Sequence, residues 1–560
     1  MENILKSRRY RIAYFSLEVG LDERIPTYAG GLGVLAGDFL RSAADLEAPV
    51  VGVTLVNGKG FFAQRLDSEG NQIEEEVPWN PGDYMALLEE AAEVPIEGRR
   101  VYVKSWLYKV VGATGYEVPV IFLDTDMIPN LDQDRDLTGY LYGGDAEYRL
   151  KQEIILGIGG VRMLDKLGMH IRKFHMNEGH SSLLGMELMK RDMEKNPQKP
   201  VENVAEDVRE RCIFTTHTPV ATGHDIFPYP LVQRLLAGYL DIGLIKQQCC
   251  GDFLDMTLLG FNLSGYINGV AKKHAETSKG MFPGYAINSV TNGVHTETWT
   301  SDAFKRLYDK YIKDWRKDPF LFRYAIGIPD EEIWAAHAEG KKELLEYVNA
   351  KYSESLDDAT LTIGFARRMT SYKRPNLLFS DIERLKSISK AGGGLQIIFS
   401  GKAHPEDLKG KRMIKTILQN KRALSQDIRI AYLENYDMGI AKRMVCGVDL
   451  WLNTPLIPRE ASGTSGMKAT LNGVLNLSIL DGWWIEGYIK DITGFAIGGM
   501  ESDEEKDGED LYGKLEEISR IYYDDRKRWI SMMRYALSIN ASFFNSRRMV
   551  QQYITDAYWD

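Results

Sequence analysis

A single lysine, Lys468, lies in a run of small residues, EASGTSGMKATLNG at 460–473. A surface helix would surround a lysine with long polar side chains, whereas glycine, alanine, serine and threonine leave space beside it. Gly463, Thr464 and Ser465 precede a helix-compatible segment, and the N–H groups of a first helical turn attract anions. A lysine one turn inside that helix could form a Schiff base with an aldehyde cofactor whose phosphate lies at the helix end. Pyridoxal phosphate (PLP) meets both requirements. The alternative is a helical lysine beside a small-residue packing face.

Four cations crowd the segment FARRMTSYKRPN at 365–376, directly after a predicted strand: Arg367, Arg368, Lys373 and Arg374. The guanidinium of arginine suits bidentate contact with phosphate oxygens, and lysine adds a point charge on the same group. The segment therefore predicts an anion site. A solvated basic patch or interdomain ion pairs are the alternatives.

A glycine loop, TYAGGLGVLAGD at 27–38, lies between a predicted strand and a predicted helix. Glycines let backbone N–H groups approach an anion, and the following helix adds positive potential. The loop has neither the G-x-G-x-x-G pattern nor the Lys-Ser/Thr of a P-loop, so a tight strand–helix turn explains it equally well.

Histidines follow two other predicted strands. His217 lies in FTTHTPVATGHDIFP (214–228), and Glu178 lies in HMNEGH (175–180) beside His180. The spacing matches no compact zinc signature such as H-E-x-x-H, so we expect no metal site. A structural hydrogen-bonding role competes with a catalytic one for each histidine.

Composition restricts the class of protein. The chain has 560 residues, of which 44% are hydrophobic and 26% charged, so two or more folded domains are expected. A formal net charge of −10 argues against general nucleic-acid binding. No segment has the length and apolarity of a signal peptide or a membrane span. The chain has four scattered cysteines without a C-x-x-C motif: Cys212, Cys249, Cys250 and Cys446. They indicate reduced thiols, so a cytoplasmic protein is predicted.

Alternating strands and helices must position these loops. Short apolar strands are predicted in a first block: RIAYFSLEV (11–19), VVGVTLV (50–56), VPVIFLD (118–124), RKFHMN (172–177) and RCIFTTHTP (211–219). After a long predicted helix at 331–352, a second block of strands follows: LTIGFA (361–366), LQIIFSG (395–401), IRIAYLENY (428–436), VDLWLNTP (448–455) and VLNLSILDG (474–482). Such strands indicate parallel sheets covered on both faces. We predict an α/β fold of two Rossmann-like, doubly wound domains, residues 1–297 and 298–560, facing each other across a deep cleft. Ligands of such sheets bind at the carboxyl ends of the strands, where the four loops fall.

The motifs together resemble those of the α-glucan phosphorylases, the family of the glycogen, starch and maltodextrin phosphorylases. EASGTSGMK-x-x-LNG, followed by a strand and a DG turn, is similar to the PLP-lysine motif of that family. Further counterparts occur in the same order: YFSLE (14–18), GGLG (30–33), YRLKQE (148–153), the histidine strand (211–219), VTNGVH (290–295), RRMTSYKR (367–374) and LENY (433–436). The resemblance spans about residues 10–490 and combines the four loops into one expected site.

The resemblance implies a role for each matching residue. Lys468 would carry PLP as an internal Schiff base, and the phosphate of the cofactor would do the chemistry. The expected cofactor-binding residues are Lys468, Gly463, Thr464, Lys373, Tyr436, Tyr372 and Arg367. Arg368 and the N–H of Gly31 would hold the substrate phosphate, and the expected catalytic residues are Lys468, Arg368, Lys373, His217 and Gly31. The expected substrate-binding residues are Gly30, Gly31, Leu32, His217, Asn292, Glu460, Ser462 and Glu178.

The reaction implied is reversible phosphorolysis by a homodimer. Inorganic phosphate would attack the terminal α-1,4-linked glucosyl unit of a glucan or maltodextrin and release α-glucose 1-phosphate with retained configuration. The departing oxygen needs a proton while the ring acquires oxocarbenium character, and a phosphate on the same face supplies both proton and negative charge. Two phosphates held close together repel, so Arg368 and Lys373 would neutralise them.

The sequence departs from the long animal members of this family. Ala29 replaces an asparagine before GGLG, Asp437 replaces an arginine after LENY, and the acid of NEGH is Glu178. The chain begins almost directly at YFSLE, so the N-terminal regulatory extension has no counterpart. We therefore expect the short prokaryotic branch of the family, without allosteric control.

Two rival functions stay open. A starch- or glycogen-synthase-like transferase would share the two-domain architecture and the GGLG loop, with a nucleotide sugar as donor. EASGTSGMK has no purpose in such an enzyme, and Ala29 stands where its lysine would be. The chain could also be a catalytically silent glucan-binding protein, which the intact Arg368, His217 and Lys468 argue against.

Overall fold

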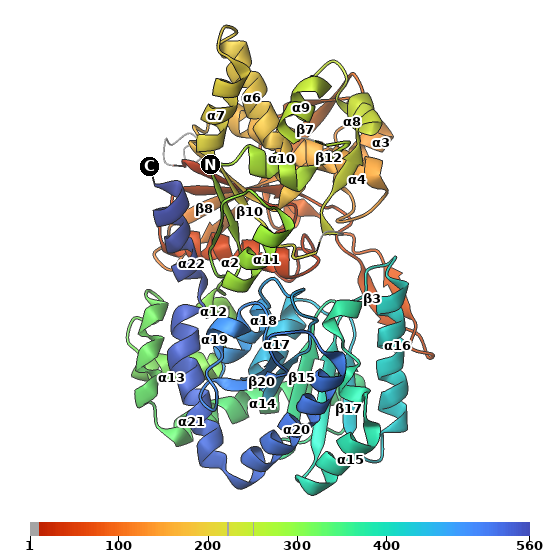
Figure 1. The fold of residues 1–560 in the computed structure, drawn as a ribbon, viewed down its shortest axis with the longest axis vertical. Coiled ribbons are helices and arrows are strands. Elements are labelled where there is room, and N and C mark those ends of the chain that lie inside the picture. Colours follow the sequence, from red (N-terminus) through yellow and green to blue (C-terminus); the bar gives the residue numbers. More distant parts are fainter. Residues whose placement is uncertain (1–9, 221–222, 250, 560) are drawn as a thin grey trace.

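The computed structural model describes residues 10–220, 223–249 and 251–559, and its strands form two large sheets (Figure 1). The first sheet lies in the upper part of Figure 1, coloured red to yellow-green, and the second lies below it, coloured green to blue. Cys250, predicted to be a reduced thiol, lies outside the described residues, as do 1–9 of the predicted first domain and 221–222 of the histidine segment.

The first sheet is parallel over most of its width. Its ten strands have the order β14-β13-β10-β9-β1-β2-β8-β7-β5, with β6 paired to β7. The strands from β14 to β8 run parallel, and β7 is antiparallel to β8, β5 and β6. Their bounds are β1 Ile12–Phe15, β2 Val50–Leu55, β5 Ala86–Leu87, β6 Ala92–Ile96, β7 Arg99–Val111, β8 Glu117–Asp124, β9 Lys173–Asn177, β10 Cys212–Thr215, β13 Tyr266–Gly269 and β14 Ile287–Ser289.

Both faces of this sheet are buried. Successive residues of β1 point to opposite sides: Ala13 and Phe15 enter one hydrophobic core, and Ile12 and Tyr14 enter another. A strand buried on both faces needs a continuous apolar run, which is the pattern from which these strands were predicted.

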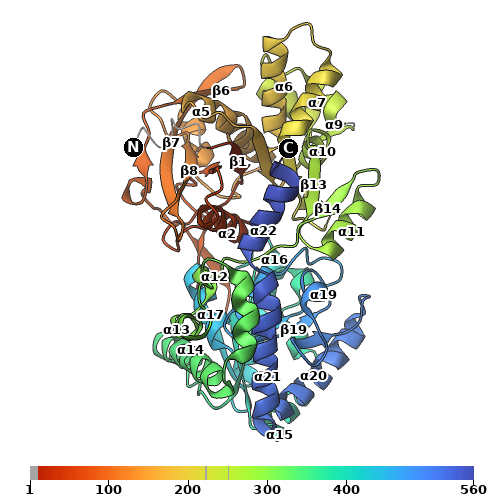
Figure 2. The same ribbon diagram turned by 90° about the vertical axis from the view of Figure 1, so that its left-hand side faces the viewer.

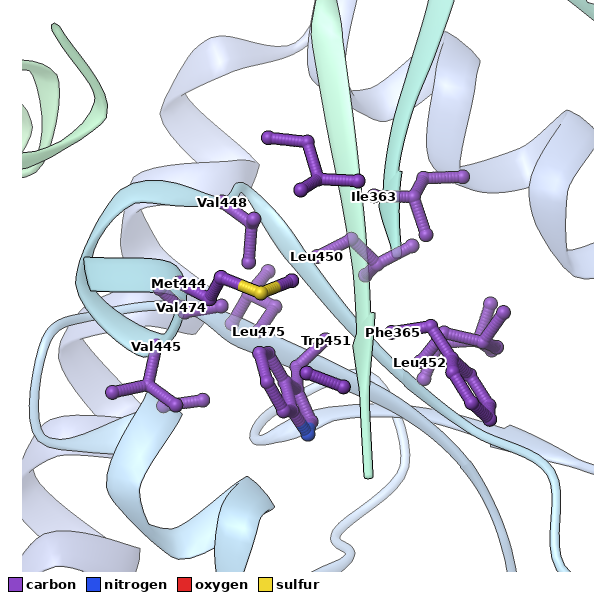
Figure 3. Close-up of a cluster of buried hydrophobic side chains, with 14 of the residues drawn as sticks. Ile363, Phe365, Met444, Val445, Val448, Leu450, Trp451, Leu452, Val474 and Leu475 are labelled. Atoms are coloured by element: carbon purple, nitrogen blue, oxygen red, sulfur yellow. The ribbon is translucent and has the colours of Figure 1, made fainter. Parts of the chain in front are cut away.

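The second sheet is wholly parallel. Its six strands have the order β17-β16-β15-β18-β19-β20. Their bounds are β15 Leu361–Ala366, β16 Leu395–Ser400, β17 Arg429–Leu433, β18 Leu450–Asn453, β19 Leu475–Ile479 and β20 Gly494–Ile497. Figure 3 shows part of its core, where Ile363 and Phe365 of β15 lie among side chains of β18 and of the segment that precedes it, such as Met444. The predicted α/β class is confirmed, while the predicted cleft and the division after residue 297 stay predictions.

Helices connect and cover these strands. In the first half they are α2 Gly31–Asp45, α3 Asp132–Arg135, α4 Ala146–Ile154, α5 Gly160–Lys166, α6 Leu183–Lys195, α7 Val201–Arg211, α8 Tyr229–Leu236, α9 Ile242–Cys249, α10 Met256–Asn262, α11 Lys272–Met281 and α12 Thr296–Trp299. In the second they are α13 Asp302–Tyr311, α14 Asp330–Tyr352, α15 Ile382–Ala391, α16 Leu408–Ala423, α17 Met438–Gly447, α18 Thr464–Thr470, α19 Trp484–Gly487, α20 Glu504–Asp524, α21 Arg526–Ala536 and α22 Ser546–Tyr553. Among the described helices, none is long and apolar enough to cross a membrane.

Two segments pass from one sheet to the other. The hairpin of β3 (Ala63–Leu66) and β4 (Gln72–Glu75) leaves the first sheet and lies beside α16, where Lys411 pairs with Glu74 at 2.7 Å (Figure 1). In the opposite direction, α22 follows the helices of the second sheet but packs on α2 (Figure 2). Beyond it, the hydroxyl of Tyr558 lies 2.5 Å from Nδ1 of His175 on β9.

Candidate active site

The predicted site residues follow the carboxyl ends of strands in both sheets. In the second sheet, Arg367 and Arg368 follow β15, and the loop after β18 carries Glu460 into α18. In the first sheet, the loops after β1, β9, β10 and β14 carry Gly30, Glu178, His217 and Asn292. The strand order reverses between β1 and β9 and between β15 and β18, and doubly wound sheets bind ligands beside such a point.

Lys468 is buried on α18 with its ammonium group against an indole ring. Nζ lies 3.8 Å from the centroid of the Trp299 ring, and Nε1 of Trp299 donates to both carboxylate oxygens of Asp38 on α2, at 3.1 and 2.8 Å. Burial lowers the pKa of Lys468 to about 8, although the charge of Asp38 opposes the shift. Within the described residues, Lys468 has this cation–π contact and no ion pair. A lysine whose amine is partly neutral near pH 8 is suited to attack a carbonyl group.

Glycines fix how α18 enters the site. Gly463, the N-cap, has a φ of 82°, a left-handed conformation that favours glycine. A Cβ atom on Gly466 would lie 2.4 Å from Oδ1 of Asn476 on β19, so the helix reaches the sheet only because this residue is glycine. Part of the small-residue pattern around Lys468 therefore serves packing, as the alternative interpretation of the motif proposed.

Glu460, Arg367 and Lys373 form a buried ion cluster in front of α18. Oε2 of Glu460 accepts hydrogen bonds from Nη2 of Arg367 at 2.9 Å and from Nζ of Lys373 at 2.5 Å. Burial raises the pKa of Glu460, but the charges of the two cations outweigh it and the pKa is lowered. Nε and Nη1 of Arg367 are also buried and have no hydrogen-bond partner among the described residues. Two unsatisfied guanidinium donors beside a lysine are an arrangement suited to an anion, as the sequence predicts.

Arg368 lies in different surroundings from its neighbour Arg367. It keeps an exposed surface, and the charges that act on it come from both sheets. Desolvation by nearby protein lowers its pKa, while Tyr372, Tyr142 and Glu18 raise it and prevail. The pKa of Tyr372 is lowered, because Lys373, 4.6 Å from its ring centroid, and the two arginines outweigh the effect of burial.

The glycine loop is held by Glu18, a residue of the YFSLE motif to which the sequence assigned no role. Its Oε2 accepts from the N–H groups of Ala29 at 2.6 Å and Gly30 at 3.2 Å, and its Oε1 accepts from the Tyr142 hydroxyl at 2.8 Å. A Cβ atom on Gly30 or Gly31 would meet nothing within 4 Å. Gly31 and Leu32 begin α2, so the N-terminus of this helix borders open space.

His217 is oriented by its neighbours after β9. Its Nε2 lies 2.6 Å from Oδ1 of Asn177, and because an amide oxygen can only accept, Nε2 carries the proton. Burial and three nearby histidines lower the pKa of His217 well below its ordinary value, so the ring is neutral. Glu178 accepts from the N–H of His217 at 2.8 Å and from the hydroxyl of Thr218 at 2.9 Å. Burial raises the pKa of Glu178, whose φ of 78° is strained for a glutamate.

Two more predicted site residues carry unsatisfied buried polar atoms. Oδ1 of Asn292 and Oγ of Ser462 are both buried, with no hydrogen-bond partner among the described residues. Tyr436 lies near Arg367, whose charge lowers its pKa while burial raises it further. Thr464 is the first residue of α18.

Arg374 does not join the anion site. Its guanidinium donates to the carbonyl oxygens of Thr454 and Pro455, both at 3.0 Å, and pairs with Asp507 at 2.7 Å. One of the four cations in 367–374 is therefore structural, and it holds the loop that presents Lys373. His180, one of the three histidines near His217, faces a different partner: its Nε2 lies 3.4 Å from a carboxylate oxygen of Asp225, and burial lowers its pKa to about 4.

Asp481, which follows β19 in the DG turn, is a site residue that the sequence analysis missed. Its Oδ2 accepts from the N–H of Glu460 at 2.8 Å, and its Oδ1 accepts from the N–H of Gly482 at 2.9 Å. Burial raises its pKa to about 7 despite these two hydrogen bonds. The DG motif marked this turn, but nothing in its spacing shows that the carboxylate reaches back to Glu460.

No group of three or more His, Cys, Asp or Glu side chains in the described parts of the chain is arranged to hold a metal ion. Two of the departures noted in the sequence, Ala29 and Asp437, have local roles. The N–H of Ala29 donates to Glu18, and Oδ1 of Asp437 caps α17 by accepting from Ile440 N at 2.8 Å.

Known proteins resemble this chain over most of its length. The two doubly wound sheets, with site loops from both, define an α/β protein of the two-sheet glycosyltransferase type. Residues 241–507 match the carbohydrate phosphorylase family. A maltodextrin phosphorylase of Thermococcus litoralis is 39% identical over 98% of this chain and 70% of the relative. A glycogen phosphorylase of Aquifex aeolicus is 36% identical over 98% and 86%, and an uncharacterized protein of Methanocaldococcus jannaschii is 31% identical over 98% and 99%. The chain belongs to the carbohydrate phosphorylase family.

Proposed function

We propose that this chain catalyses the reversible phosphorolysis of α-1,4-linked glucans or maltodextrins. Inorganic phosphate attacks the terminal glucosyl unit and α-glucose 1-phosphate leaves with retained configuration. The names of two relatives, a maltodextrin phosphorylase and a glycogen phosphorylase, support this substrate class. A homodimer in the cytoplasm remains part of the same proposal.

One observation carries the proposal: the segment 460–468 holds a lysine suited to carbonyl chemistry and also Glu460, which belongs to a buried cluster suited to an anion. Lys468 has a pKa of about 8, and Glu460 of the same segment lies in the cluster of Arg367 and Lys373. A nucleotide-sugar transferase needs no buried lysine at this position, whereas a phosphate-bearing aldehyde cofactor needs both features.

The residues present fit PLP. Arg367 retains two buried donors without partners, the Oγ of Ser462 is buried and unsatisfied, and Gly463 opens the helix that carries Lys468. We assign attachment of the cofactor to Lys468, and contact with its phosphate to Lys373, Arg367 and the N–H groups of Gly463 and Thr464. Tyr372 and Tyr436 would line the same space. When bound, PLP supplies a phosphate group that exchanges a proton with the substrate phosphate.

The chain's own residues would hold the substrate phosphate close to that group. Arg368, exposed beside the glycine loop, and the N–H of Gly31, at the N-terminus of α2, would bind it. These positive charges would offset the repulsion between the two phosphates. They would also set the pKa of the proton that the phosphates share. Gly30 and Leu32 flank the same helix N-terminus.

Polar groups around the sugar would orient its hydroxyls. His217 is neutral and is fixed by Asn177, so it acts as a positioned hydrogen-bonding group rather than a charge. The unsatisfied amide oxygen of Asn292 and hydroxyl of Ser462 are suited to sugar hydroxyls, as are the carboxylates of Glu460 and Glu178.

An absorbance spectrum of the purified protein supplied with PLP tests the proposal. We expect a band from the lysine-bound cofactor that borohydride fixes on Lys468 and that Lys468→Ala lacks. Glucose 1-phosphate should then form from maltodextrin and phosphate. A protein without the band would exclude the mechanism, and binding of a nucleotide sugar would identify the synthase-like alternative. A band without glucose 1-phosphate formation would favour a silent glucan-binding protein.

A further inference from the structure

The loop that carries Asn292 is held by residues from two distant elements. Nη2 of Arg548, on α22, donates to the carbonyl oxygens of Thr291 at 2.6 Å and Asn292 at 3.1 Å. From the other side, both carboxylate oxygens of Glu486, on α19, accept from the hydroxyl of Thr291 at 3.0 Å. The carbonyl groups of Thr291 and Asn292 are therefore both fixed by Arg548, and the side chain of Thr291 is fixed by Glu486.

Arg548 is a half-buried cation whose acceptors are neutral. Besides the two loop carbonyls, its Nε donates to the carbonyl of Phe543 at 3.1 Å and its Nη1 to the amide oxygen of Gln552 at 3.2 Å. Within the described residues it forms no direct ion pair, and burial lowers its pKa to about 10, although the charges of Glu486 and Tyr553 oppose the shift. Desolvating a charge that has no carboxylate in direct contact is costly, and the four donated hydrogen bonds of the guanidinium offset part of that cost.

The backbone around the loop leaves no room for adjustment. The N–H of Val294 donates to the carbonyl of Phe544 at 3.2 Å, and the N–H of Ser546 donates back to Val294 at 3.0 Å. A Cβ atom on Gly293 would lie 2.1 Å from the carbonyl oxygen of Asn545. The loop and the start of α22 are thus in direct backbone contact next to Asn292.

Asn292 itself has a polar atom without a partner. Its N–H donates to the carbonyl of Val270 at 3.0 Å, but Oδ1 of its side chain is buried and unsatisfied within the described structure. With the backbone held on both sides, the direction of this amide depends on the clamp formed by Arg548 and α22.

We propose that Arg548 is a positioning residue: it holds the carbonyls of Thr291 and Asn292 and thereby aims the amide of Asn292 at the glucosyl unit. The inference rests on the proposed function and extends it to a residue that contacts no ligand. It also gives α22, which lies on the first sheet, a part in substrate binding.

A double-mutant cycle tests this role. Arg548→Met keeps the length of the side chain and removes every donor; Asn292→Ala removes the amide that Arg548 is proposed to aim. The measurements are kcat and KM for maltodextrin at saturating phosphate, together with the melting temperature and the PLP band. Arg548→Met should lower kcat/KM about tenfold or more, as expected for hydrogen bonds donated by a charged group. The double variant should be no worse than Asn292→Ala within about twofold.

Two further variants control the result. Arg547→Met removes the neighbouring arginine, whose Nη1 donates to the carbonyl of Asp45 at 3.3 Å, and should leave kcat/KM unchanged. Arg548→Lys keeps the charge with fewer directed donors and should recover part of the activity; it replaces Arg548→Met in the cycle if that variant does not fold. Multiplicative losses in the double variant, with an active parent, would overturn the inference alone. A parent that forms no glucose 1-phosphate would overturn the proposed function, and the inference with it.

Discussion

Two adjacent arginines of the site are in different situations. Arg367 is committed to Glu460 and lies near Tyr436, whereas Arg368 keeps an exposed surface near Glu18 and Tyr142. A side chain already bound within a buried cluster suits a resident group, and an exposed one suits a ligand that enters and leaves. This difference supports the assignment of Arg367 to the cofactor and Arg368 to the substrate phosphate.

Arg368→Ala should distinguish the site of the substrate phosphate from the site of the cofactor phosphate. Removing this guanidinium takes away a charge that acts on the reacting phosphate, so kcat/KM for phosphate should fall on the order of 100-fold. The PLP band should persist, because Lys468, Lys373 and Arg367 are untouched. Arg412→Ala, on the exposed side of α16, is the matched control. Full activity of Arg368→Ala would show that the substrate phosphate binds elsewhere.

The pKa of Lys468 makes the stability of the cofactor-free protein depend on pH. The folded chain releases the proton at about pH 8 and the unfolded chain at about 10.5, so the free energy of unfolding should rise between these values. The rise is up to about 3 kcal/mol, since one pKa unit corresponds to about 1.4 kcal/mol. Below about pH 8 both states are protonated and the contribution is constant.

Urea denaturation at several pH values measures this effect as the difference between the parent and Lys468→Met. The parent should gain stability relative to the variant from about pH 8 to 10.5. Lys409→Met removes an exposed lysine of α16 and should show no such difference. Parallel curves for the parent and Lys468→Met would mean that the ammonium group is solvated in the folded protein.

Among the elements, the loop after β15 depends on a helix far along the chain. Arg374 has a left-handed backbone, with φ 46°, and its guanidinium is fixed by Asp507 of α20. Asp507 lies in ESDEEKDGED (501–510), a run whose many acids are typical of a solvated loop. One of its acids is instead buried and holds the turn that presents Lys373.

Asp507→Ala should therefore destabilise the protein and weaken cofactor binding together. Breaking a buried pair leaves Arg374 without its counter-ion and costs about 3 kcal/mol or more of unfolding free energy. Glu505→Ala, an exposed acid of the same helix, should change it by less than about 1 kcal/mol. Chemical denaturation and a PLP titration measure both effects. Unchanged PLP affinity in a destabilised variant would mean that the turn keeps its shape without the pair.

The sequence predicts well those elements whose hydrophobic pattern lies in consecutive residues. The strand 361–366 matches β15 at both ends, and the helix at 331–352 matches α14 within one residue, because both have clear hydrophobic patterns. The antiparallel β7 was missed, since its alternation RRVYVKSWLYKVV departs from the buried pattern of the other strands. Glu18, Asp481 and Asp507 were missed because their partners are set by tertiary contacts.

For the whole molecule, the β3–β4 hairpin links the two sheets through a buried glutamine, Gln64. Nε2 of Gln64 donates to the carbonyl of Gly401 at 2.9 Å, and its Oε1 accepts from the N–H of Asn435 at 3.0 Å. The side chain therefore satisfies polar groups at the carboxyl ends of β16 and β17, next to the LENY segment.

Gln64→Leu should loosen this link. It leaves the N–H of Asn435 without a partner, which costs about 1–3 kcal/mol if that group stays buried. The carbonyl of Gly401 loses one of two donors and keeps the hydroxyl of Tyr432 at 2.7 Å. Hydrogen exchange at Asn435 should become faster than in the parent, while Ser68→Ala, at the exposed tip of the hairpin, should leave it unchanged. Equal exchange rates in Gln64→Leu and the parent would show that water or another group replaces the glutamine.

The return of α22 to the first sheet has a consequence for synthesis on the ribosome. Tyr553 and Tyr558 complete a polar network with Thr215 and His175 inside the first sheet, so its core lacks these partners until residues 546–558 have been made. The second sheet has all its strands by residue 497. The part of the chain that is synthesised first therefore completes its folding last, and its unfinished core has to be kept from aggregating while the rest emerges.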